Sequence, residues 1–115
     1  ATAAAARVVI TFKDFSVAAV APSAKAGDVT FEVKNDGKLP HQFVVVKSDL
    51  DPAALPLHDQ KEVDEPKVQI VTRISDFDSG QSKTVAAKLA PGKYVLLCNV
   101  PSHYSSGMFT AFVVN

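Results

Sequence analysis

Three side chains that bind soft metals lie close together near the C-terminal end of the sequence. The stretch CNVPSHYSSGM, residues 98 to 108, holds the only cysteine, the only methionine and one of the three histidines. Four residues separate Cys98 from His103, and four more separate His103 from Met108. A thiolate, an imidazole and a thioether together favour copper, whereas magnesium, calcium and manganese prefer oxygen ligands.

A rigid metal site rarely takes all its ligands from one loop, so a second histidine is expected from elsewhere. The segment NDGKLPHQFVVV supplies His41, which stands at the start of a strand-like run directly after a turn. The proline before it restricts the backbone of Leu39. Two histidines and one cysteine in a plane, with a weak axial methionine, form the mononuclear copper site of electron-transfer proteins.

Short strand-like runs make up most of the chain. They are rich in β-branched and aromatic residues and are separated by turn sequences such as NDGKLP, DSGQS and APGK. The runs cover residues 7–12, 15–21, 29–35, 42–47, 68–74, 83–89, 93–100 and 108–114. Seven or eight short strands in this length predict an all-β fold, an antiparallel β-sandwich with Greek-key connections.

Strand alternation places the candidate ligands within this sandwich. In KYVLLC, Tyr94, Leu96 and Cys98 share one face, and Met108 begins the next strand on the side of its apolar neighbours. Each sulfur residue is therefore expected at the end of a core strand. His103 falls on the loop between them, at the rim of the sandwich.

Length and charge limit the remaining possibilities. The 115 residues predict one domain, residues 1–115, with a flexible leader over residues 1–6 and a surface insertion over about 48–66. Twelve basic and twelve acidic residues cancel, which argues against nucleic acid as a partner. No apolar run approaches the roughly 20 residues of a membrane span. We expect the acids of the insertion to keep it solvated.

At NDGKLPH, residues 35–41, and CNVPSHYSSGM, residues 98–108, the sequence resembles the cupredoxins, the small blue copper proteins. The spacing of the second motif is similar to that of the auracyanin, rusticyanin and sulfocyanin branches. The resemblance implies one copper ion per chain, with His41, Cys98 and His103 as equatorial ligands and Met108 as the axial ligand. It also implies that the edge of the His103 ring is the electron exit.

Two positions depart from the family pattern. The residue after the first histidine is often asparagine, and here it is Gln42; the glycine often found two residues after the methionine is Thr110. Gln42 and Asn99, each next to a ligand, are expected in the surroundings of the site. A docking face for redox partners is expected around His103, formed by Leu39, Pro40, Val100, Pro101 and Tyr104.

These features predict a monomeric electron carrier and not an enzyme. The resemblance implies transient contact with redox proteins such as cytochromes or copper oxidases and reductases. The absence of an initiator methionine, together with the resemblance, favours an exported protein of the periplasm or an equivalent space.

Other functions remain open on the sequence alone. A copper carrier or storage protein could use the same four ligands without a redox partner. A catalytic zinc site is less favoured, because neither an HExxH motif nor an obvious general base accompanies the cysteine and histidines. An adhesion domain of the same fold would bind no metal. His58 has no partner at ligand spacing and is expected on the surface.

Overall fold

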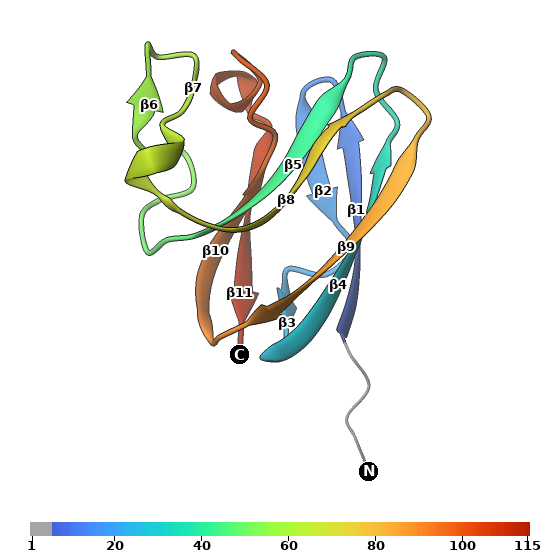
Figure 1. Ribbon diagram of the computed structural model, residues 1–115, viewed down its shortest axis with the longest axis vertical. Coiled ribbons are helices and arrows are strands. Elements are labelled where there is room, and N and C mark those ends of the chain that lie inside the picture. Colours follow the sequence, from blue (N-terminus) through green and yellow to red (C-terminus); the bar gives the residue numbers. More distant parts are fainter. Residues whose placement is uncertain (1–5) are drawn as a thin grey trace.

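The computed structural model describes residues 6–115 as two β-sheets packed face to face (Figure 1). The first sheet has the order β2-β1-β4-β9 and the second the order β3-β11-β10-β5-β8. Their strands are β1 (Ala6–Lys13), β2 (Ser16–Ala19), β3 (Ser23–Ala24), β4 (Gly27–Asn35), β5 (His41–Lys47), β8 (Gln69–Phe77), β9 (Ser82–Leu89), β10 (Gly92–Leu97) and β11 (Phe109–Val114). The predicted leader lies outside the described residues except for Ala6, where β1 begins.

The predicted sandwich is confirmed, and each of the eight strand-like runs corresponds to a strand of the two large sheets. The pairing differs from the prediction in one respect, because β1 pairs with β4 in parallel, as β3 does with β11. After β2 the chain crosses to the other sheet as β3 before it returns as β4. It therefore re-enters the first sheet in the direction of β1.

The core between the sheets consists of the side chains that face inward from both sheets. In β4, Val29, Phe31 and Val33 are buried, with more exposed residues between them. Phe31 makes ring contacts with Phe43 of the opposite sheet. Cys98 and Met108 belong to the same buried cluster, as the strand alternation predicted.

A second buried cluster lies on the outer side of the larger sheet. Here the insertion packs its inward-facing residues Leu55 and Val63 against β5 and β10, so these two strands are buried on both faces. The insertion contains the short pair β6 (Leu57–His58) and β7 (Glu62–Val63), and the 3-10 turn η1 (Glu65–Lys67) follows directly.

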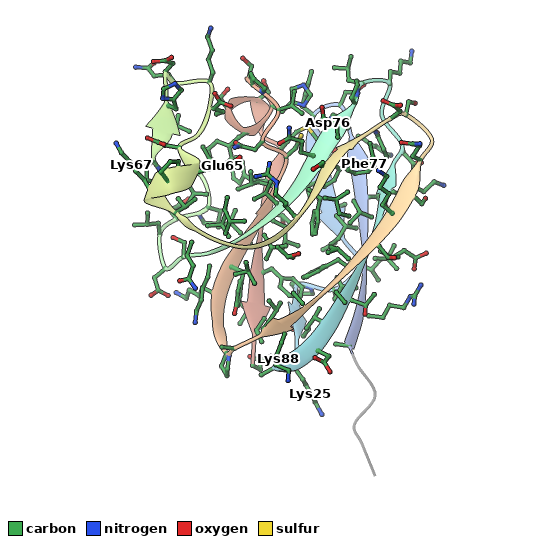
Figure 2. The ribbon with its side chains drawn as sticks, viewed as in Figure 1. Lys25, Glu65, Lys67, Asp76, Phe77 and Lys88 are labelled. Atoms are coloured by element: carbon green, nitrogen blue, oxygen red, sulfur yellow. The ribbon has the colours of Figure 1, made fainter. Side chains whose placement is uncertain are left out.

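The elements around the predicted ligands gather at one end of the sandwich. In Figure 1 the turn between β1 and β2, the start of β5, the 3-10 turn η2 (Tyr104–Ser106) and the β6–β7 pair lie at the upper end. Figure 2 shows Lys25 and Lys88 at the opposite end. Among residues 6–115, no helix has the length and apolar character to cross a bilayer.

Candidate metal centre

His41 is the first residue of β5, and its side chain is completely buried. The ring makes an edge contact with Phe12, with ring centroids 5.7 Å apart. Its Nε2 lies 2.8 Å from Oδ1 of Asp14. An ionised carboxylate can only accept hydrogen bonds, so Nε2 of His41 carries a hydrogen, and Nδ1 is the ring nitrogen left to bind a metal.

Cys98 follows the last residue of β10 and is also completely buried. Its Sγ accepts a hydrogen bond from the backbone N–H of Gln42 at 3.3 Å. Burial raises the pKa of the Cys98 thiol, and hydrogen bonds from the amides of Gln42 and Val100 oppose that shift. A metal ion that binds here must therefore displace the thiol proton.

His103 lies on the loop after β10, directly before η2, and only 8% of the residue is exposed. It is more buried than the expected loop position suggested, because the ring of Phe15 packs against it at 5.1 Å between centroids. Burial lowers the pKa of His103, and the nearby His41 lowers it further. The imidazole is therefore neutral at neutral pH, as a metal ligand must be.

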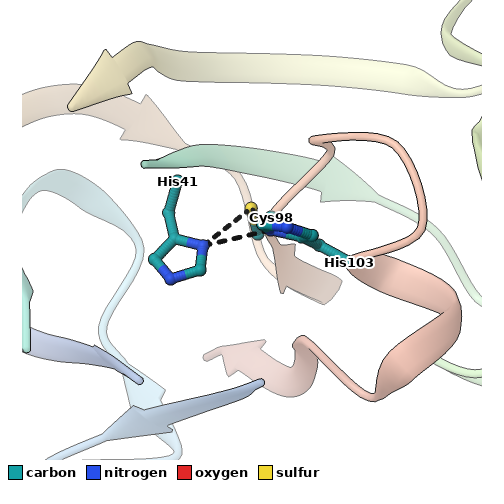
Figure 3. A group of neighbouring side chains, drawn as sticks. All are labelled: His41, Cys98 and His103. Atoms are coloured by element: carbon teal, nitrogen blue, oxygen red, sulfur yellow. Dashed lines mark hydrogen bonds between the residues drawn. The ribbon is translucent and has the colours of Figure 1, made fainter. Parts of the chain in front are cut away.

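These three side chains converge on one point (Figure 3). Nδ1 of His41 lies 3.1 Å from Nδ1 of His103, and Sγ of Cys98 lies 3.6 Å and 3.4 Å from these two nitrogens. Atoms that share one metal ion at about 2.0 to 2.3 Å must lie within about 4.6 Å of one another, a condition that all three pairs meet. Two imidazoles and a thiolate form a donor set suited to copper.

The backbone of Met108 is tied to two of these residues, directly before β11. Its carbonyl accepts a hydrogen bond from the amide of Cys98 at 3.1 Å, and its own amide donates to the carbonyl of His103 at 3.2 Å. The side chain is completely buried in the same cluster as Cys98. The position is compatible with the predicted axial ligand, which stays a prediction.

The turn between β1 and β2 holds two residues that the sequence analysis missed. Asp14 contacts His41, and Phe15 contacts His103. In the sequence, Asp14 falls in the short polar connection between two strand-like runs, and Phe15 was expected to begin the second run, whereas the structure places both in the turn. Only the pairing of β1 with β4, which places this turn beside the segment before β5, brings them to the site.

Gln42 and Asn99, which were expected near the ligands, both make contacts there. The side-chain Oε1 of Gln42 accepts a hydrogen bond from Arg73 at 3.3 Å, in addition to the contact of its amide with Cys98. Asn99 contacts the insertion. Its Oδ1 accepts a hydrogen bond from the amide of Val63 at 2.8 Å, and its Nδ2 donates to Glu65 at 2.8 Å. The insertion is therefore fastened to the ligand loop.

The residues predicted to form the docking face differ in their exposure. Leu39, Pro40 and Pro101 are exposed, while Val100 is half-buried. The prediction for Tyr104 is wrong, because the residue is only 2% exposed and its hydroxyl accepts a hydrogen bond from the amide of Leu55 at 3.2 Å. The insertion covers Tyr104, and strand alternation could not reveal that cover.

His58 is exposed on the insertion, as expected, with its Nε2 3.3 Å from a carboxylate oxygen of the neighbouring Asp59. It does not belong to the cluster of His41, Cys98 and His103, the group of metal-binding side chains that residues 6–115 bring together.

Comparisons with known proteins agree with this geometry. The family model described as the sulfocyanin (SoxE) domain matches residues 16–115. A search of curated proteins finds no match.

Solved structures with the same fold include an auracyanin from Roseiflexus castenholzii, with a TM-score of 0.75 and 25% identity over 98% of this chain and 99% of that one. Auracyanin A from Chloroflexus aurantiacus, described as a blue copper protein, has a TM-score of 0.63 and 21% identity over 95% and 99%. Reduced rusticyanin has a TM-score of 0.72 and 20% identity over 100% and 82%.

Proposed function

Since this chain belongs to the sulfocyanin family of blue copper proteins, we propose that it carries single electrons between redox partner proteins through one copper ion held by His41, Cys98 and His103. The observation that supports this proposal most is the convergence of the three buried donor atoms, all within 3.6 Å of one another. Copper, when bound, supplies the one-electron cycle between Cu(I) and Cu(II).

The protein's part in this cycle is to keep the ligands in one place. His41 and Cys98 adjoin paired strands, and the amide of Gln42 holds Sγ of Cys98. A buried donor set that cannot rearrange keeps the geometry similar in both oxidation states, which lowers the energy needed to move an electron. Cupredoxins are mainly electron carriers, and we propose that this chain is likewise not an enzyme.

We assign Met108 as a weak axial ligand, because its fully buried position ties it to Cys98 and His103. A thioether in this role adjusts the reduction potential more than it adjusts binding. Met108→Leu should therefore keep the intense colour of the thiolate–copper bond and shift the reduction potential. Loss of copper binding in this variant would contradict a weak axial role.

Electrons would leave through the edge of His103 across an apolar rim. We define this rim as Phe15, Leu39, Pro40 and Pro101, of which Phe15 is 43% and Leu39 40% exposed. A small apolar surface suits brief contacts with redox proteins such as cytochromes or copper oxidases and reductases. We also propose that the protein is monomeric and works in the periplasm or an equivalent extracytoplasmic space.

A charge on the apolar rim tests this docking role. In Pro101→Glu, two copies that meet rim to rim bring like charges together, so we expect electron self-exchange to slow about tenfold or more while the absorption spectrum is unchanged. Val20→Glu is a matched control, because Val20 is exposed and follows β2 at the end away from the Asp14 turn. Wild-type exchange in the Pro101 variant would contradict the docking role.

The alternative function, a copper carrier or storage protein, is distinguished from an electron carrier by whether the protein transfers copper or electrons. Fast self-exchange with a stable, intensely coloured Cu(II) form supports electron transport. Slow self-exchange with ready release of Cu(I) to a chelating acceptor would instead identify a copper carrier.

A further inference from the structure

The carboxylate of Asp14 is the one charged group in contact with a metal ligand among the described residues. Its Oδ1 lies 2.8 Å from Nε2 of the fully buried His41, while the Asp14 side chain itself is only 22% exposed. A partly dehydrated charge interacts more strongly with its neighbours than a charge in bulk water does. The contact therefore affects both the orientation and the electron density of the ring.

The segment before β5 is shaped around this carboxylate. The amide of Lys38 donates to Oδ2 at 2.8 Å, and the amide of Leu39 lies 3.4 Å from Oδ1. Gly37 leaves the space that the carboxylate occupies, because a Cβ at this position would lie 2.2 Å from Oδ1 of Asp14 and 3.0 Å from Nε2 of His41.

The side chain of Asn35 fixes the same segment from inside. Its Oδ1 accepts a hydrogen bond from the amide of Gly37 at 2.9 Å, and its Nδ2 donates to the carbonyl of Leu39 at 2.8 Å. Asn35 is completely buried. The Asp14 carboxylate is therefore bound by a segment whose own conformation is fixed by the hydrogen bonds of Asn35.

We propose that Asp14 is a positioning residue that holds His41 as the tautomer with hydrogen on Nε2 and lowers the reduction potential of the copper site. A metal-binding histidine that donates to a carboxylate is fixed in orientation and becomes a more basic ligand. The added negative charge favours Cu(II), which carries one more positive charge than Cu(I). This inference rests on the copper site described above.

Asp14→Asn tests the effect of the charge, because it keeps the shape of the side chain. We expect the affinity for Cu(II) to fall about tenfold more than the affinity for Cu(I), which raises the reduction potential by about 59 mV for a one-electron couple. Asp36→Asn is the matched control, because it also removes a carboxylate from the region before β5. The Asp36 carboxylate pairs with Lys34 and does not contact His41. A potential in Asp14→Asn no higher than in this control would overturn the proposal.

Gly37→Ala tests the contact in a different way, because it keeps the charge and displaces the carboxylate from His41. We expect the potential to rise in the same direction as in Asp14→Asn. The backbone of Gly37 does not need a positive φ, so alanine is compatible with the chain conformation. A wild-type potential in Gly37→Ala would contradict a role for the contact.

The tautomer can be measured without copper, which separates this inference from the proposed function. In the metal-free wild-type protein, ¹⁵N NMR should show the His41 hydrogen on Nε2. A His41 that carries its only hydrogen on Nδ1 would overturn the proposal even if copper binding were normal. A normal tautomer in a protein that shows no thiolate–copper colour would leave this part standing and contradict the electron-carrier function.

Discussion

The two histidines of the site have contrasting surroundings. His41 begins a central strand, is completely buried, and its Nε2 contacts a carboxylate held by the turn before β5. His103 lies on a loop, contacts the exposed ring of Phe15, and has no hydrogen bond at Nε2 from any of residues 6–115. One ligand is fixed by a charged residue of the β1–β2 turn, and the other faces the surface.

This difference separates two demands on an electron carrier. A stable site requires ligands that do not move, which the surroundings of His41 provide. An electron must also reach a partner, and only a ligand near the surface can come close to one. The loop that carries His103 is then stabilised from outside, through the contacts of Asn99 with the insertion.

The largest expected effect comes from removal of each ring. Both His41→Gly and His103→Gly should lose the intense colour of the thiolate–copper bond, because each removes one of three strong ligands. Added imidazole should restore the colour in His103→Gly, since that position lies at the surface rim. It should not restore it in His41→Gly, where Phe12 and Asp14 enclose the ring.

Absorption titrations with copper and imidazole measure this difference. His58→Gly is the matched control, since His58 is exposed and outside the cluster, and it should keep the full colour without imidazole. Equal restoration in the two ligand variants would show that the two histidines are equally accessible, and the contrast would be wrong.

Local spacing and strand alternation were sufficient to predict that His41, Cys98 and His103 come together at one site. Cys98, His103 and Met108 are close in sequence, and alternation correctly placed both sulfur residues in the core. The second histidine followed from the need for one more ligand. The sandwich followed from strand number and turn composition.

The surroundings of the ligands could not be predicted in the same way. Asp14 and His41 are 27 residues apart and meet only because two strands pair in parallel. Tyr104 was misplaced because its burial depends on the insertion, whose path leaves no periodic pattern in the sequence. Contacts set by the packing of irregular segments need the folded structure.

Two buried asparagines offer a matched test of how each histidine is supported. Asn35 holds the segment beside His41, and Asn99 holds the insertion against the His103 loop. Replacement of either by alanine leaves buried backbone groups unpaired, so we expect each to lose about 2 to 3 kcal/mol in the free energy of unfolding. Denaturant titration measures this loss.

Hydrogen exchange should distinguish the two variants. Asn35→Ala should increase exchange at the amide of Gly37, and Asn99→Ala should increase it at the amide of Val63. Only Asn35→Ala should also raise the reduction potential, because it frees the segment that binds the Asp14 carboxylate and so weakens the contact between Asp14 and His41. A higher potential in Asn99→Ala but not in Asn35→Ala would show that the His103 loop, and not the segment beside His41, sets the potential.

The smallest expected effect concerns a network of polar side chains that connects the two sides. Glu65 accepts hydrogen bonds from Asn99 and from Arg73, which in turn donates to Gln42 beside His41. The hydrogen bond from Arg73 lowers the pKa of Glu65 most, and that from Asn99 lowers it further. A carboxyl whose pKa is lowered by folding stabilises the protein above its unfolded pKa, and the effect is lost as pH falls through its folded pKa.

Stability should therefore decrease on acidification below the ordinary glutamate pKa of 4.5, and Glu65→Gln should remove that part of the decrease. Because both partners are about one third exposed, we expect a difference of less than about 1 kcal/mol. Denaturant titrations of both proteins between about pH 3 and pH 6 measure it. If the two proteins lose stability in parallel across this range, Glu65 does not couple the insertion to the strand that carries Arg73, and the His103 side is supported by Asn99 and the insertion backbone alone.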